Sequence, residues 1–417
     1  MELKRVVITG LGALTPMGNT VEEFWDNLLK GVSGADDITR FDASNYKTHF
    51  ACEVKNYDPK NYFDRKEVRK LDPYAQYAMI ASDQAIRDSG IDADSIDKNR
   101  VGVIMATGIG GFTTFLNDAA EFGRSEGNPR FNPFFIPKII GDIAAGHISI
   151  KYGFRGPNYA TTSACASAGH AIINAFNYIR LGKSNAIVTG GSEAGINPAG
   201  IGGFNAMHAI STRNDDPKTA SRPFDKDRDG FVLGEGSCAI VLEDFEHALK
   251  RGAKIYGEIV GGGSTADAHH ITSPHPDGLG AMLAMKEAIE EASIEPNMVD
   301  HINTHGTSTP VGDIAEPKAI VSLFGEHAYK MNLNSTKSMH GHLLGAAAAV
   351  EIVATVLSVK NDTIPPTINH FTDDPAIDNA LNFTYHKAAK RTVNFALSNS
   401  FGFGGHNTCI AVKKYHV

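Results

Sequence analysis

The chain has 417 residues, of which 42% are hydrophobic and 21% are charged. These proportions are typical of folded globular proteins and exclude extensive disorder, and the length suits two lobes around large buried cores. A net charge of −8 argues against general nucleic-acid binding. Four scattered cysteines without a CxxC pair indicate neither a disulfide framework nor a zinc site. We find no long apolar run and no signal-peptide core after MELKRVVITG, so the sequence predicts a cytoplasmic protein without membrane insertion.

Short β-branched segments bounded by glycines predict buried strands that alternate with helices. They cover residues 5–9, 101–106, 186–189, 238–242 and 255–260. The clearest helix start is Thr20, which forms a predicted capping box with Glu23, and the apolar residues that follow lie on one helix face. Alternating strands and helices predict an α/β architecture with mainly parallel sheets.

Two segments in opposite halves of the chain resemble each other. TTSACASAGHAIINAFNYI begins at Thr161 and STKSMHGHLLGAAAAVEIVATVL begins at Ser335. Each is a polar turn of small residues followed by an Ala-rich apolar helix, and small residues permit close packing against neighbours. The pattern predicts a duplicated fold joined near residues 242–252, although two unrelated buried helices would show the same periodicity.

Cys165 precedes the first of these helices, within the segment SACAS. The N–H groups and positive dipole end at a helix start favour a thiolate, which predicts a lowered thiol pKa. The same N–H groups can stabilise an oxyanion. Because small flanking residues leave room for a substrate, we interpret Cys165 as a nucleophile rather than an inert buried cysteine.

Two histidines lie in polar turns of the second half. His305 occurs in NTHGTSTP after a predicted strand, and His342 occurs in SMHGH before the second Ala-rich helix. Ligands of α/β proteins bind at such strand ends. The pairs His301-x3-His305 and His340-x-His342 resemble metal-ligand spacings, but no carboxylate or cysteine accompanies them, which argues against a metal site.

A basic cluster stands out in this acidic chain. In the segment DRKEVRK, Arg65 and Arg69 are i, i+4 neighbours, and so are Lys66 and Lys70. These four residues therefore form one face of a predicted helix. Such a face would dock an acidic partner protein. An ordinary solvated helix face, partly neutralised by neighbouring acidic residues, is the alternative interpretation.

Seven ordered segments resemble the β-ketoacyl-acyl carrier protein synthases of the type II class, within the thiolase-like superfamily. They run over essentially the whole chain: VVITGLGALTPMG, SACASAGHA, STRNDDPKTASRPFDKDRDGFVLGEG, DAHHITSPHPDG, NTHGTSTPVGD, NSTKSMHGHLLGAAAAVE and SNSFGFGGHN. The resemblance implies a five-layer αβαβα fold made of two similar halves, with the nucleophile in residues 1–250 and the catalytic histidines in residues 251–417. It also implies a homodimer.

The implied activity is that of an acyltransferase in fatty acid elongation. Acyl-acyl carrier protein condenses with malonyl-acyl carrier protein to give 3-oxoacyl-acyl carrier protein, carbon dioxide and free carrier protein. By resemblance, the catalytic residues are Cys165, His305, His342 and Lys337, with Glu351 supporting them. Further residues carry over as follows: the backbone oxyanion hole, Cys165 and Phe403; the acyl pocket and its gate, Ile109 and Phe403; and the pantetheine contacts, Thr307 and Thr309.

No cofactor is required for this chemistry, and the resemblance implies only a monovalent cation near Glu351, Ser398 and Asn399. The chain departs from the family pattern at His340 and His406, where many relatives have Thr, at His208, where Arg is frequent, and at Ala348, which replaces a common Gly. These departures leave the catalytic set intact and leave the chain-length preference open.

Three rival functions resemble this one in sequence. A degradative thiolase would use a second reactive cysteine, for which Cys409 is the nominal candidate, but Cys409 lies in a predicted strand without flanking glycines. A non-catalytic chain-length subunit would lack the nucleophile. A ketosynthase of a specialised polyene or polyketide pathway would read almost identically.

Overall fold

The computed structural model describes residues 3–128 and 130–416 and is built around a ten-stranded sheet. Five strands come from the first half of the chain and five from the second. The first set is β1 (Val6–Leu14), β4 (Val101–Ala106), β5 (Asn158–Thr161), β6 (Ala186–Glu193) and β7 (Gly236–Asp244). The second set is β8 (Gly257–Ala266), β9 (His301–Asn303), β10 (Asn332–Asn334), β13 (Phe395–Gly402) and β14 (His406–Lys413).

The two sets of strands have the same topology. The order across the sheet is β10-β9-β13-β14-β8-β1-β7-β6-β4-β5. In each half the first strand therefore lies innermost, followed outwards by the fifth, fourth, second and third. The two halves meet where β1 pairs with β8 through Val6, Val7 and Ile8. This repeated order supports the duplication that the sequence predicts.

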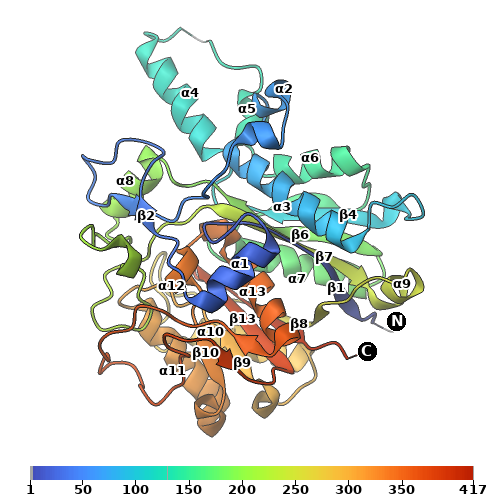
Figure 1. Ribbon diagram of the computed structural model, residues 1–417, viewed down its shortest axis with the longest axis vertical. Helices are drawn as coiled ribbons and strands as arrows, with labels where there is room; N and C mark the ends of the chain where they lie inside the picture. The colour runs from blue at the N-terminus through green and yellow to red at the C-terminus, as the bar shows by residue number, and fades with distance from the viewer. Residues whose placement is uncertain (1–2, 129, 417) are drawn as a thin grey trace.

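Helices pack on both faces of the strands, which gives the five-layer arrangement (Figure 1). The two resembling segments form α7 (Ser167–Arg180) and α13 (Ala347–Asn361), which contact each other in the middle layer. The outer layer of the first half contains α3 (Pro73–Ser89) and α6 (Ile143–Tyr152). The outer layer of the second half contains α10 (Leu279–Glu291) and α11 (Gly312–Phe324).

The prediction of mainly parallel sheets is wrong. Parallel pairing is confined to β10-β9-β13 and to β5-β4-β6, whereas the strands between them pair antiparallel. In the second half, the antiparallel pairing of β13 with β14 follows from the short connection between them. Only a tight turn at residues 403–405 separates the two strands, and a hairpin can join only antiparallel strands. In the first half, β7 begins 43 residues after β6 ends but follows the same repeated topology.

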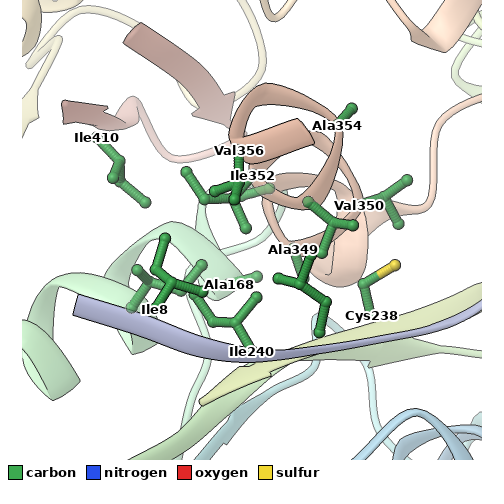
Figure 2. Packing of buried hydrophobic residues seen from close by; sticks show 14 of the residues in the cluster. Ile8, Ala168, Cys238, Ile240, Ala349, Val350, Ile352, Ala354, Val356 and Ile410 are labelled. Carbon is green, nitrogen blue, oxygen red and sulfur yellow. The ribbon is translucent and has the colours of Figure 1, made fainter. Parts of the chain in front are cut away.

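The central helix α13 packs against strands of both halves (Figure 2). Its side chains, including Ile352 and Val356, lie in one hydrophobic cluster with Ile8, Ile240 and Ile410. The segment Leu344–Asn361 is long and apolar enough to cross a membrane, which corrects the expectation that the chain has no such run. It is, however, 89% buried inside the protein, so it is a core helix that exposes almost no surface to its surroundings.

Further helices and two short strand pairs complete the fold. Thr20 caps α1 (Val21–Lys30) by accepting from the Glu23 N–H, but the Glu23 carboxylate accepts from Asn19, so only half of the predicted capping box forms. Helices α4 (Phe112–Arg124) and α5 (Phe135–Ile139) project from the body (Figure 1). The other elements are α2 (Arg65–Val68), α8 (Pro198–Ala206), α9 (Phe245–Lys250), α12 (Lys337–His340) and the two-stranded pairs β2 (Asp36–Asp37) with β3 (Phe50–Ala51) and β11 (Thr363–Ile364) with β12 (Ala389–Lys390).

Candidate active site

Cys165 lies on a tight turn between β5 and α7. Ala164 before it has a φ of +50°, a left-handed conformation that costs a residue with a side chain about 1–2 kcal/mol. The turn is held by Ser167, whose hydroxyl donates to the Ala164 carbonyl at 2.6 Å, and by Ser400, whose hydroxyl donates to the Cys165 carbonyl at 2.8 Å. Strained backbone that is held in this way is common at functional sites.

Both predicted histidines lie near this turn. The Nε2 of His342 lies 3.0 Å from the Cys165 Sγ, and the rings of His305 and His342 stand edge to face with centroids 5.4 Å apart. Burial lowers the pKa of both histidines well below the usual value, and the positive charge of Lys337 lowers it further. Both imidazoles are therefore neutral at physiological pH, and each carries one N–H donor and one acceptor nitrogen.

The prediction of a lowered Cys165 pKa is wrong. Burial raises the pKa of this thiol to about 12, although Lys337 and the Phe403 N–H both act to lower it. Burial outweighs the effect of the helix start, because α7 begins only at Ser167 and only 7% of Cys165 is exposed. A neutral thiol beside a neutral imidazole needs that imidazole as its base.

A buried ion pair lies behind the histidines. Lys337 and Glu351 are 1% and 0% exposed, and the Lys337 Nζ donates to Glu351 Oε1. Burial raises the pKa of Glu351 to about 7, against the opposing effect of the lysine. Lys337 thus supplies a fixed positive charge that both catalytic-site histidines and the thiol experience.

A cavity of about 440 Å³ opens over this cluster. Its lining includes Cys165, His305, His342 and Phe403. The Phe403 N–H acts to lower the pKa of the Cys165 thiol, as a donor facing the sulfur in an oxyanion hole would. Gly402 permits this approach, because a Cβ there would lie 2.9 Å from the Cys165 nitrogen.

The other predicted pocket residues also line the cavity. The hydroxyls of Thr307 and Thr309 lie 3.0 Å apart, and Ile109 is at the wall with 44% of its surface exposed. Lys337 and Glu351 are not part of the wall and act from behind it. The cavity thus combines a nucleophile, two imidazoles and an apolar wall.

Several buried oxygens near Glu351 have no hydrogen-bond donor in the described part of the chain. They are Glu351 Oε2, Asn399 Oδ1 and Asn303 Oδ1. Asn303 lies opposite Ser398 in the β9–β13 pairing, and its amide donates to the Glu351 carbonyl. Unpaired buried carboxylate and amide oxygens are the ligand type that a hard cation prefers, so these residues fit the implied cation. No cluster of three or more His, Cys, Asp or Glu side chains suited to a metal occurs among residues 3–128 and 130–416.

Two buried glutamates of the site were not identified from the sequence. Glu316 accepts from the N–H groups of His305 and Gly306, both at 2.9 Å, and so fixes the backbone that carries His305. Glu193 accepts from the N–H groups of Gly108 and Ile109 and from that of Gly345. The signal for Glu193 was its place at the end of a buried strand, and the signal for Glu316 was an acid early in the helix after the His305 loop.

The family departures have separate structural positions. His340 is fully buried, donates from Nδ1 to the Gly341 carbonyl and accepts at Nε2 from Thr336, and burial lowers its pKa to about 3. His208 lines the cavity, and His406 is exposed with its ring against Gly404 beside Phe403. Ala348 is buried in the core. None of these residues replaces a member of the Cys165 cluster.

The predicted docking helix is shorter than expected. Helix α2 spans four residues, and Lys70 already turns back through a hydrogen bond to the Glu67 carbonyl. Asp64 and Glu67 form a full capping box at its start. Arg65, Lys66, Arg69 and Lys70 are all exposed, so the cluster is accessible to a partner even though two full turns do not form.

Cys409 lies in β14, as the sequence predicts, and is 0% exposed. It does not line the cavity, and burial raises the pKa of its thiol well above the usual value. Cys52 and Cys238 are likewise buried, and Cys238 packs in the central cluster shown in Figure 2. Cys165 is the cysteine that the cavity reaches among the described residues.

Comparisons with known proteins agree with this geometry. Residues 3–248 match the family "Beta-ketoacyl synthase, N-terminal domain" and residues 256–371 match "Beta-ketoacyl synthase, C-terminal domain". A protein of Synechocystis named 3-oxoacyl-acyl-carrier-protein synthase 2 is 48% identical over 415 residues, which covers 100% of this chain and 99% of the relative. A Staphylococcus aureus protein of the same name is 47% identical over 412 residues, 99% of each chain.

Solved structures give the same result. A β-ketoacyl synthase from Burkholderia phymatum superposes with a TM-score of 0.92 at 33% identity, covering 99% of this chain and 100% of that one. A structure described as a type II polyketide acyl-carrier protein in complex with its ketosynthase bound to the hexaketide superposes with a TM-score of 0.92 at 32% identity and the same coverage. With both family domains matched in order and relatives almost half identical from end to end, this chain belongs to the β-ketoacyl synthase family.

Proposed function

We propose that this chain is a 3-oxoacyl-acyl carrier protein synthase that elongates fatty acids. The observation that carries the proposal is the Cys165 thiol at the wall of a cavity, 3.0 Å from a neutral His342, with His305 and Phe403 in the same wall. The names of the curated relatives support fatty acid synthesis over a specialised pathway, because those relatives are more similar to the chain than the polyketide ketosynthase is. The presence of Cys165 argues against a non-catalytic subunit.

The first step is transfer of the acyl group to Cys165. His342 Nε2 accepts the thiol proton as the sulfur attacks the thioester carbonyl, and the N–H groups of Cys165 and Phe403 bind the oxyanion. The bond to the carrier sulfur then breaks, and the proton passes to the departing carrier thiolate. Acyl-Cys165 and free carrier protein are the products.

The second step is loss of carbon dioxide from the malonyl thioester. The bond between the α-carbon and the carboxylate breaks, and its electron pair forms an enolate on the thioester oxygen. Neutral His305 supplies an N–H to that oxygen, and neutral His342 supplies a second one after its ring proton has exchanged through solvent from Nδ1 to Nε2. Burial, together with the fixed charge of Lys337 behind them, keeps both rings neutral.

The third step joins the two chains. The α-carbon attacks the acyl-Cys165 carbonyl, the same two backbone N–H groups bind the new oxyanion, and the carbon–sulfur bond breaks. The Cys165 thiolate takes up one proton from solvent, and 3-oxoacyl-carrier protein leaves. These steps transfer no electrons to an acceptor, so no redox cofactor is needed.

Further parts of the proposal concern binding. The pantetheine arm would lie along Thr307 and Thr309, the carrier protein would dock on Arg65, Lys66, Arg69 and Lys70, and Ile109 with Phe403 would gate the acyl pocket. A monovalent cation held by Glu351, Ser398 and Asn399 would neutralise the unpaired buried oxygens.

We also propose a homodimer in a reducing cytoplasm. The projecting α4–α5 region exposes apolar side chains, which is typical of a surface that a partner covers; they are Phe115, Phe122, Phe131, Phe134, Ile136 and Ile140. All four cysteines are free.

The test is reconstitution with purified carrier protein. The chain is incubated with malonyl-carrier protein and acyl-carrier proteins of graded length, and the products are identified by mass spectrometry. We expect 3-oxoacyl-carrier protein two carbons longer than each accepted primer, together with one carbon dioxide per turnover. Cleavage of added 3-oxoacyl-coenzyme A by coenzyme A, with no condensation of malonyl-carrier protein, would instead indicate a degradative thiolase.

A further inference from the structure

The segment that carries Thr307 and Thr309 has no regular secondary structure. Residues 304–310 lie between β9 and α11, and Thr307, Thr309 and Pro310 line the cavity. A loop without helix or sheet hydrogen bonds needs other groups to fix its backbone. The geometry of the two threonine hydroxyls therefore depends on the groups that bind the carbonyl groups of this loop.

Arg228 binds those carbonyl groups. Its Nε donates to the Thr309 carbonyl at 3.0 Å and one terminal nitrogen donates to the Pro310 carbonyl at 2.8 Å. The other terminal nitrogen donates to the Asp225 carbonyl and to Asp374 Oδ2, both at 2.7 Å. The side chain is only 3% exposed, so this guanidinium fork spans two successive carbonyls with almost no contact with solvent.

The rest of the same loop supports this contact. The Gly230 N–H donates to the Ser308 carbonyl and the Arg222 N–H donates to the Ser308 hydroxyl, each at 3.0 Å. Asp313 accepts from the N–H groups of Ser308 and Phe224 and lies 3.8 Å from Arg228. Residues 222–230 therefore form a cradle for residues 308–310, and Arg228 is its charged centre.

We propose that Arg228 is a positioning residue for recognition of the pantetheine arm. It does not line the cavity and touches no reacting group. It acts by fixing the Thr309–Pro310 backbone, so that the hydroxyls of Thr307 and Thr309 meet the arm together. The inference rests on the proposed function, because it assumes that a pantetheine thioester enters this cavity.

The test compares substrates with and without the arm. In Arg228→Lys the charge remains, but one ammonium group has three donors on a single nitrogen and loses the fork that spans both carbonyls. We expect KM for acyl-pantetheine and for acyl-carrier protein to rise about tenfold, the effect of one lost charged hydrogen bond, with kcat nearly unchanged. Acylation of Cys165 by an S-ethyl acyl thioester, which lacks the arm, should keep the wild-type rate.

Two further variants make the result decisive. Arg213→Lys alters a guanidinium of the preceding turn, which donates to the Asp227 carbonyl, and should leave KM unchanged. Asp374→Asn weakens the ion pair that holds Arg228 on the side away from the loop. It should raise KM only for substrates that carry the pantetheine arm, so it tests the inference if Arg228→Lys does not fold.

An equal loss of activity with acyl-pantetheine and with the S-ethyl thioester would overturn the inference. An unchanged KM for acyl-pantetheine in Arg228→Lys would overturn it as well. A wild-type protein that forms no 3-oxoacyl product would instead overturn the proposed function, and this control is run first. The two failures are therefore distinguishable.

Discussion

Lys337→Met removes the positive charge behind the catalytic histidines and leaves Glu351 buried without its partner. Because Lys337 and Glu351 are 1% and 0% exposed, solvent screens neither charge. Removing one member of a buried ion pair typically costs about 3–5 kcal/mol. Glu351 already has a pKa raised to about 7 and loses the group that lowers it, so it takes up a proton and the expected loss lies near the lower end, about 3 kcal/mol.

The same substitution changes the pH dependence of decarboxylation. Burial and, after it, the charge of Lys337 lower the pKa of His305 and His342, so removal of Lys337 raises both part of the way toward the ordinary value of about 6.5. The neutral rings are the active form, and a raised pKa means that they become protonated at higher pH. We therefore expect the acid limb of malonyl decarboxylation to move to higher pH in Lys337→Met.

The assays are carbon dioxide release from malonyl-carrier protein between about pH 5 and 8, where histidine titrates, and denaturant unfolding of the same samples. In the double variant Lys337→Met/Glu351→Gln no unpaired carboxylate remains, so stability should recover relative to Lys337→Met, whereas the shifted acid limb should persist. An acid limb identical to that of the wild type in both variants would refute the reasoning, because Lys337 would then not influence the histidines.

Three other substitutions test separate parts of the proposed function. His305→Ala should lower malonyl decarboxylation about 10²–10³-fold, the effect of one lost oxyanion donor, while acylation of Cys165 falls much less; normal decarboxylation would exclude His305 as a donor. Ile109→Phe should shorten the longest accepted acyl chain and spare short substrates, and an unchanged length profile in the product assay would remove Ile109 from the pocket. Lys66→Glu with Arg69→Glu should raise KM for acyl-carrier protein, most strongly at low salt, without affecting small thioesters; equal losses for both would make the cluster structural.

The sequence identified the residues that meet at the cavity but not the environment they meet in. Cys165, His305 and His342 each follow a strand or precede an Ala-rich helix, and residues at such positions converge at one edge of a sheet. Their positions at neighbouring strand ends therefore predict that these three side chains lie close together. The depth of burial depends on side chains from both halves, which is why a raised Cys165 pKa could not be foreseen from the helix start.

Contacts between distant segments account for the other omissions. Glu193 binds Gly108 from 85 positions away and Gly345 from 152 positions away, and no local periodicity encodes such a contact. Arg228 lies within a segment that the resemblance identified, yet its target carbonyls are 81 and 82 residues further along. Strand direction failed for a related reason, because β1 pairs antiparallel with β7 and β8, which lie far from it in the sequence.

Peptide mapping after incubation with acyl-carrier protein alone shows whether Cys165 is the nucleophile. Without malonyl-carrier protein the second substrate is missing, so the acyl-enzyme should accumulate. We expect one acyl group per chain, on Cys165, and none in Cys165→Ala, because the cavity reaches this cysteine and the other three are buried away from it. An acyl group on Cys409, or full acylation of Cys165→Ala, would contradict it.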